Sequence, residues 1–178
     1  DSLIISLLAG VKLSRLHKSF PDFQCVRAVP NAPSLVGAGL TGLAWDEAMP
    51  LEQISAVKAI FEPVSEIFHL PENQLDAFLA LTSSGPAYVA LIVEALADGA
   101  VAAGLPRNSA YYLSHRTLAG SALLLKEREM QPSELKDMVA SPGGTTIAGL
   151  RHLEKERVRS ALIESVVLAA ERSRDMSS

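Results

Sequence analysis

The sequence is poor in several residue types, and each shortage excludes a class of site. Its 178 residues include one cysteine, Cys25, so an internal disulfide and a cysteine-based metal cage are both excluded. A lone cysteine is typical of a protein from a reducing compartment. The histidines lie far apart and show no metal-ligand spacing, and they are His17, His69, His115 and His152. We therefore expect no metal site.

Signals for nucleic acid, secretion and hydrolysis are lacking as well. Lys and Arg are scattered, and the net charge is −4, so nucleic acid is not an expected partner. The first apolar run is not preceded by the basic segment of a secretory signal. The serines Ser83, Ser84 and Ser141 lie outside any G-x-S-x-G motif, so the sequence does not favour a hydrolase. These features predict a cytoplasmic protein.

Aliphatic residues are abundant, and their spacing divides the chain. Apolar runs predict strands at 3–8, 25–29, 43–46 and 64–69, and helices at 12–20 and from Pro50, placed at the first helical position, to Phe61. Strand alternating with helix is typical of an α/β domain, but residues 1–70 supply too few strands for a complete sheet. Beyond residue 70 only helices are expected, at 72–81, 87–104, 109–127, 132–140, 147–154 and 157–174. The predicted fold is mostly α, with domains at 1–70 and 71–178.

A literal G-x-G-x-x-G runs from Gly37 to Gly42. A dinucleotide fingerprint needs a strand before it and a helix after it. Here a loop containing Pro33 precedes the motif, and a short strand from Leu43 follows it. We therefore interpret the motif as a glycine-rich loop leading into a strand.

The predicted helix 87–104 is apolar on nearly every side. Its length approaches that of a membrane span, but Glu94 and Asp98 would each be costly at a bilayer centre. We expect instead a helix of a soluble protein, buried between partner helices. The two carboxylates lie four residues apart on one face. They could form a catalytic pair, although hydrogen-bonded or solvated helix residues are the favoured interpretation.

The segment 139–150 is the strongest candidate for a binding site. Gly143 and Gly144 leave room for a close approach, and Pro142 cannot continue the preceding helix. Thr145 or Thr146 is expected to cap a new helix that starts near Ile147. A helix N-terminus surrounded by hydroxyl groups is suited to a carboxylate or phosphate. A capped interhelical turn without a ligand is equally consistent with these residues.

Four ordered motifs resemble the pyrroline-5-carboxylate reductase family. The first is the segment Pro132-Ser133-Glu134-Leu135 followed by Val139 to Leu150 and Leu153-Glu154. The others are Val29-Pro30-Asn31-Ala32-Pro33, then Ser84-Gly85-Pro86-Ala87-Tyr88, then Glu94 to Gly99 with Gly104-Leu105-Pro106. The resemblance runs from about residue 3 to residue 174.

The resemblance implies reduction of 1-pyrroline-5-carboxylate to L-proline, the last step of proline biosynthesis, with NADPH or NADH. Members of the family have an N-terminal Rossmann domain and a helical domain that interleaves in homodimers, many of which form decamers. Residues 1–70 would be the C-terminal part of the Rossmann domain, and 71–178 the helical dimerisation and substrate-binding domain. The family's nucleotide fingerprint would lie upstream of Asp1, so we expect the chain alone to bind the dinucleotide poorly and to be inactive.

The resemblance also implies the residues of the site. Ser141, Thr145 and Thr146 would hold the substrate carboxylate, while Gly143 and Gly144 allow its approach. Thr146 would also reach the ring nitrogen, which makes it the catalytic candidate. Ala9-Gly10 and Pro30-Asn31 match loops near the nicotinamide. In the family the substrate turn faces a Rossmann domain across the dimer interface.

Two alternatives come from other classes. The chain could be a non-catalytic dimerisation or ligand-binding module that lacks its nucleotide domain. It could also belong to the β-hydroxyacid dehydrogenases, which combine the same two kinds of domain. Those enzymes need a catalytic lysine on a helix, and Lys126 and Lys136 have the pattern of surface residues.

Overall fold

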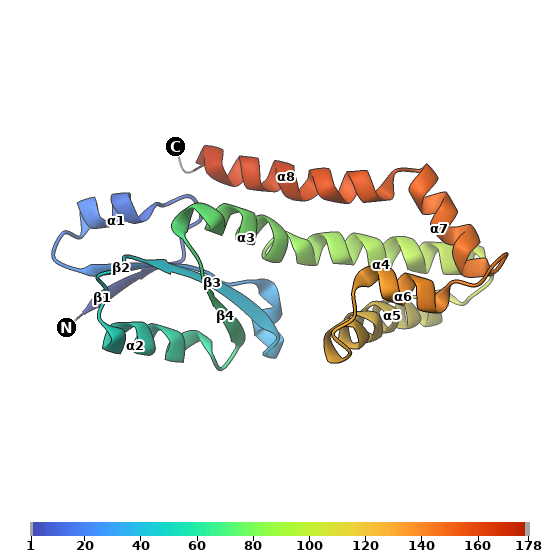
Figure 1. Cartoon of the computed structure of the whole chain (residues 1–178), viewed down its shortest axis with the longest axis horizontal. Coiled ribbons are helices and arrows are strands. Elements are labelled where there is room, and N and C mark those ends of the chain that lie inside the picture. The colour runs from blue at the N-terminus through green and yellow to red at the C-terminus, as the bar shows by residue number, and fades with distance from the viewer. Residues whose placement is uncertain (1, 177–178) are drawn as a thin grey trace. The chain divides into compact units, whose positions relative to one another are not determined.

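The computed structural model describes residues 2–176 and divides into two compact units (Figure 1). The first unit comprises residues up to Pro86 and from Ile163 onward, and the second comprises Ala87–Leu162. The first unit contains the whole described sheet, and the second is helical. This confirms the predicted fold class, in which the last elements of an α/β domain precede a helical domain.

The first unit is built on a four-stranded mixed sheet in the order β1-β2-β3-β4. Its strands are β1 (Leu3–Ser6), β2 (Gln24–Val29), β3 (Gly39–Trp45) and β4 (Ser65–His69). The pairs β1–β2 and β3–β4 are parallel, while β2 and β3 are antiparallel. All four predicted strands are therefore present, although β1 ends two residues earlier than expected.

The two faces of this sheet bury different clusters, because successive side chains of a strand point to opposite faces. Val26 and Leu43 pack on one face with Val57 and Phe61 of α2 (Leu51–Phe61). Cys25 and Ala44 pack on the other face, with Leu13 and Leu16 of α1 (Leu13–Ser19) and with Leu75. Figure 1 shows α1 and α2 on opposite sides of the strands. The unit is therefore a three-layer α/β/α arrangement.

Two prolines mark turns between these elements. Pro30 follows β2, and the segment η1 (Ala32–Val36) after it is a 3₁₀ turn where only a loop was predicted. Pro50 is the N-cap of α2, with Leu51 as the first helical residue. The prediction that Pro50 occupies the first helical position was therefore wrong by one residue.

The glycine motif 37–42 has a structural role at each glycine. Gly37 has φ +71° and ends η1 in the left-handed conformation. A Cβ on Gly39 would lie 2.0 Å from Ser34 Oγ and 2.8 Å from the Val64 carbonyl oxygen, and one on Gly42 would lie 2.7 Å from Cδ1 of Phe78. The interpretation as loop and strand is confirmed, but β3 begins at Gly39, four residues before the predicted Leu43.

We expect Gly39→Ala to destabilise the protein by about 3 kcal/mol, because backbone and side chain close on the new methyl group from two sides. Gly37→Ala has open space around its Cβ and meets only the cost of a positive φ, about 1 kcal/mol. Urea unfolding of both variants and the wild type measures the difference. Equal losses at the two positions would contradict the close approach at Gly39.

The first unit also contains α3 (Leu75–Thr82) and most of α8 (Val158–Met176). The part of α8 that belongs to the first unit begins at Ile163. The helix predicted for 72–81 starts as a 3₁₀ turn, η2 (Glu72–Gln74). The second unit holds α4 (Gly85–Ala102), α5 (Arg107–Glu127), α6 (Pro132–Val139) and α7 (Thr145–Lys155), with the first two residues of α4 in the first unit. Each predicted helix is present, and the boundaries shift by a few residues.

The helices of the second unit bury few of their own side chains. Over the described residues of α4 to α7, the buried ones are Ala97, Ala110 and Ser114. Large apolar side chains are exposed instead, among them Val89, Leu91, Leu96, Tyr112 and Leu123. An apolar surface of this kind marks a protein interface.

The stretch Glu72–Ala102, which runs through α3 and α4, is long and apolar enough to cross a membrane. Length and composition alone are weak evidence, because core helices of soluble proteins share them. Within α4, Asp98 is ion-paired with Arg107 at the start of α5. The charged residues of α4 fit a protein interface better than a bilayer.

Candidate functional site

The turn between α6 and α7 is formed by Ser141-Pro142-Gly143-Gly144. The N–H of Gly144 donates to the carbonyl oxygen of Ser141 at 3.0 Å, which closes a four-residue turn. Pro142 stands at its second position, and Gly143, with φ +69°, at its third. Proline followed by a residue of positive φ is the sequence requirement of a type II β-turn. The turn therefore needs both residues for its backbone, whether or not a ligand binds.

The helix α7 begins directly after this turn, at Thr145. Its N-cap is Gly144, in an extended conformation with φ −78° and ψ 174°, and no side-chain hydrogen bond caps it. Thr145 and Thr146 are thus the first and second helical residues. The prediction that a threonine caps a helix starting near Ile147 was wrong, because Gly144 takes the extended cap conformation and the helix starts two residues earlier.

Because the N-cap is a glycine, the N–H groups in the first turn of α7 receive no side-chain acceptor from the cap residue. The N-terminus of a helix is the end at which anions bind. A Cβ on Gly144 would lie 2.4 Å from Ser141 Oγ, so the serine hydroxyl stands over the helix start. Ser141, Gly143 and Thr145 are exposed, and Gly144 and Thr146 are half-buried. All five predicted substrate residues therefore lie within one accessible turn.

The predicted cofactor residues gather at one edge of the sheet in the first unit. Ala9-Gly10 follows β1 and Pro30-Asn31 follows β2. Because β1 and β2 are adjacent and parallel, with Ser6 paired to Arg27, their following loops leave the sheet at the same edge. The edge at the carboxyl ends of parallel strands is where α/β sheets bind nucleotides.

Asn31 holds its loop in place with its own side chain. Its Nδ2 donates to the carbonyl oxygen of Thr82 at 3.0 Å, and its Oδ1 accepts from the N–H of Leu40 at 2.8 Å. The hydroxyl of Ser83 also donates to the carbonyl oxygen of Pro30, at 3.4 Å. These hydrogen bonds therefore hold the loop against the C-terminal end of α3 and against β3.

Gly10 is packed closely by the last turn of α8. Gly10 has φ +77°, and a Cβ there would lie 2.8 Å from the carbonyl oxygen of Met176. Beside it is a hollow of about 290 Å³, lined by Ala9, Gly10, Leu79, Ser84, Ala169, Arg172, Ser173 and Met176. Only a residue without a side chain fits between this loop and α8.

The other residues considered for catalysis, Asp98, Lys126 and Lys136, lie on the surface of the helices. The hydrogen bond from Arg107 to Asp98 raises the pKa of Arg107, and Arg107 also lies 5.4 Å from the ring centre of Tyr111. Asp98 is thus an ion-paired surface residue, as the favoured interpretation held. Lys126 and Lys136 are exposed on α5 and α6.

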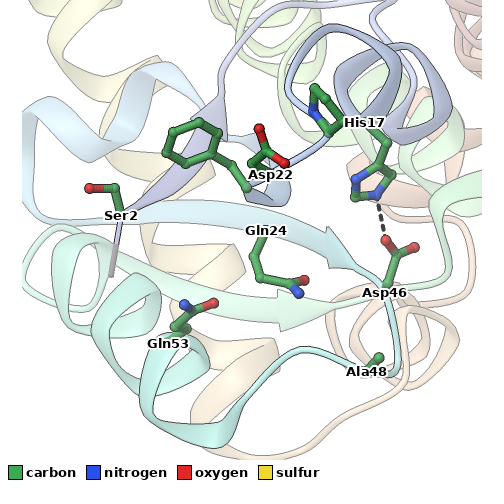
Figure 2. Close-up of a pocket in the computed structure, with 9 residues that line it drawn as sticks. Ser2, His17, Asp22, Gln24, Asp46, Ala48 and Gln53 are labelled. Carbon is green, nitrogen blue, oxygen red and sulfur yellow. Dashed lines mark ion pairs between the residues drawn. The ribbon is translucent and has the colours of Figure 1, made fainter.

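A larger hollow of about 530 Å³ lies where β2 begins and β3 ends, the opposite edge of the sheet from the loops 9–10 and 30–31. Figure 2 shows His17 ion-paired with Asp46 there, with Gln24 and Gln53 nearby. Burial, and secondly the charge of Asp46, raise the pKa of the neighbouring Cys25 thiol, which therefore stays protonated near neutral pH. This hollow contains none of the predicted site residues.

Comparison with known proteins gives consistent results. The family described as pyrroline-5-carboxylate reductase dimerisation matches residues 72–176. A pyrroline-5-carboxylate reductase of Synechocystis sp. is 51% identical over 98% of this chain and 65% of its own length. The structure of a Plasmodium falciparum pyrroline carboxylate reductase with NADP bound superposes with a TM-score of 0.94, at 32% identity, over 99% of this chain and 72% of its own.

A structure from Coxiella burnetii, also a pyrroline-5-carboxylate reductase, gives a TM-score of 0.91 at 35% identity, over 99% of this chain and 66% of its own. The chain thus covers about two thirds of the length of these relatives, and 65% of the length of the Synechocystis protein. The similarity covers both compact units, since nearly all of this chain is aligned in each case.

Proposed function

The chain belongs to the pyrroline-5-carboxylate reductase family, and on that premise we propose that the full-length protein reduces 1-pyrroline-5-carboxylate to L-proline with NADPH or NADH. The observation that carries the proposal is the start of α7. Its first N–H groups are not capped by a side chain of the N-cap residue, the Ser141 hydroxyl lies beside Gly144, and Thr145 and Thr146 are the first two helical residues. That combination suits the carboxylate of the substrate.

Each residue of the turn has a distinct role. Ser141 and Thr145 donate hydrogen bonds to the carboxylate, and Gly143 and Gly144 keep side chains out of its approach. Thr146, at the second position of α7, orients the ring through its nitrogen. A bound and oriented imine needs little further chemistry from the protein, because positioning and electrostatics supply most of the rate.

The loops at the sheet edge fit a dinucleotide. Gly10 lies against the backbone of Met176 in α8, and Asn31 is held by its hydrogen bonds to Thr82 and Leu40, so both loops have fixed places at this edge. Ala9, Gly10, Pro30 and Asn31 would form one wall of the nicotinamide site, and the reduced nicotinamide supplies the hydride when bound. The relative from Plasmodium falciparum was solved with NADP bound, which supports this class of cofactor.

The domains, partners and location follow the same premise. We take residues 1–70 as the C-terminal part of the Rossmann domain and 71–178 as the helical dimerisation and substrate-binding domain. The exposed apolar helices of the second unit support a homodimer, with a decamer as the larger candidate assembly. A cytoplasmic location accords with the lone, buried Cys25.

The test is an assay of the purified full-length protein with 1-pyrroline-5-carboxylate and NADPH or NADH. We expect loss of the reduced cofactor's absorbance together with an equal amount of L-proline. Substrate binding by calorimetry without any turnover would replace this function by that of a non-catalytic binding module. If the protein shows no turnover and binds no substrate, both the reductase function and the binding-module function are refuted.

A further inference from the structure

Glu72 connects three segments of the first unit that are distant in sequence. Its Oε1 accepts a hydrogen bond from the N–H of Leu13 at 2.6 Å and another from Nη1 of Arg27 at 2.9 Å. Leu13 is the first residue of α1, and Arg27 belongs to β2. One carboxylate therefore joins η2 to the start of α1 and to the sheet.

The bond to Leu13 supplies a cap that α1 lacks locally. The N-cap residue Lys12 makes no side-chain capping hydrogen bond, and α1 has no acidic residue in its first turn. A carboxylate at a helix N-terminus satisfies a free N–H group and interacts favourably with the helix dipole. Glu72 provides both from 59 positions away.

The bond to Arg27 fixes Glu72 in turn. Arg27 is 3% exposed, and its Nε has no hydrogen-bond partner among the described residues. A buried guanidinium needs a compensating charge, so the pair holds the Glu72 carboxylate at one place. That place is the end of the segment 7–12, which links β1 to α1 and contains Ala9-Gly10.

The other side of the same segment is held from α3. Asp76, four residues after Glu72, accepts a hydrogen bond from the hydroxyl of Ser173 at 2.6 Å, and both residues are buried. This bond secures the last turn of α8, whose Met176 carbonyl lies against Gly10. The segment 7–12 is thus held at Gly10 by α8 and at Leu13 by Glu72.

We propose that Glu72 is a positioning residue, which holds the segment 7–12 and thereby sets the place of Ala9-Gly10 in the nicotinamide site. The kinetic part of this inference rests on the proposed function. Glu72 touches neither substrate nor cofactor in it, and acts only through the Leu13 N–H group and Arg27. A misplacement of the loop by about 1 Å is enough to weaken binding and turnover strongly.

The kinetic test compares Glu72→Gln and Glu72→Leu in the full-length enzyme. We expect the KM for NADPH to rise about tenfold in Glu72→Leu, with a lower kcat and an unchanged KM for 1-pyrroline-5-carboxylate. The glutamine keeps an oxygen that can accept from Leu13, so Glu72→Gln should recover part of the loss. General destabilisation would lower the amount of active enzyme without separating the two KM values.

The matched control is Glu66→Gln, which removes an equal charge from an exposed position on β4. It should leave all three constants at wild-type values. A KM for NADPH within twofold of wild type in both Glu72 variants would overturn the kinetic role. So would a rise of the same size in Glu66→Gln.

Hydrogen exchange of the full-length protein without ligands tests the structural part independently of activity. We expect amides in 7–13 to exchange at least tenfold faster in Glu72→Leu than in the wild type, with no change in the turn 141–146. Unchanged exchange in 7–13 would overturn the positioning role. If amides 7–13 are protected in the wild type and lose this protection in the Glu72 variant, but the wild type has no reductase activity, the proposed function fails while the positioning role stands.

Discussion

Replacing Leu91 with glutamate in the full-length protein will separate its subunits and unfold much of the helical unit. Leu91 lies in α4, and 65% of its surface is exposed. It lines an open hollow of about 540 Å³ with Ala87, Ala90, Val93, Glu94 and Tyr111. If a second copy covers this surface, the new carboxylate is buried without a partner, at a cost of several kcal/mol.

Light scattering and thermal unfolding by circular dichroism measure the two effects. The matched control is Leu51→Glu, because Leu51 is 80% exposed at the start of α2, where an acidic residue is favourable. We expect the control to keep the dimer mass and the wild-type melting temperature. A Leu91→Glu protein of wild-type mass and stability would contradict the assignment of this surface to the interface.

The size of the expected effect follows from how little the second unit buries by itself. With Ala97, Ala110 and Ser114 as the buried residues described in α4 to α7, these helices have almost no core of their own. In the proposed homodimer, the stability of such a unit would depend on association and therefore on protein concentration. Dilution should lower the melting temperature of the wild type for the same reason.

The helices and most strands could be predicted from the sequence because their signals are local. The apolar spacing of α2 and the proline and glycine positions around α5 are read within a few residues. The start of β3 could not be predicted in this way. Gly39 and Gly42 resemble strand breakers until Val64 and Phe78, far along the chain, are seen to occupy the space of their side chains.

The candidate site also contains residues with a local sequence signal and residues without one. The turn 141–146 is contiguous, so its residues could be located from the sequence, while its anion-binding character stays a prediction. The predicted capping residue and helix start were wrong, because Gly144 is the N-cap and α7 begins at Thr145. The loops 9–10 and 30–31 came from the family resemblance, and the parallel pairing of β1 with β2 explains why they share an edge. The role of Glu72 had no local signal, since both of its hydrogen bonds reach 45 or more residues along the chain.

Thr146→Ala in the full-length enzyme will lower kcat/KM for 1-pyrroline-5-carboxylate about 10- to 100-fold, with contributions from a higher KM and a lower kcat. The estimate corresponds to the loss of one hydrogen bond to a charged or polarised group, about 1.5–3 kcal/mol. Thr146 is half-buried at the second position of α7, a helix whose start no side chain of the N-cap residue caps. Without the hydroxyl, the ring is held less firmly for hydride transfer.

The helix itself should survive this change, because alanine has a higher helix propensity than threonine and the N-cap is Gly144. Thr146→Ser keeps the hydroxyl and is the matched control, with kcat/KM expected within about threefold of wild type. The KM for NADPH should not move in either variant, since the cofactor loops belong to the other compact unit. Equal kinetics for Thr146→Ala and the wild type would remove Thr146 from the site and leave substrate orientation to Ser141, Thr145 and the backbone of α7.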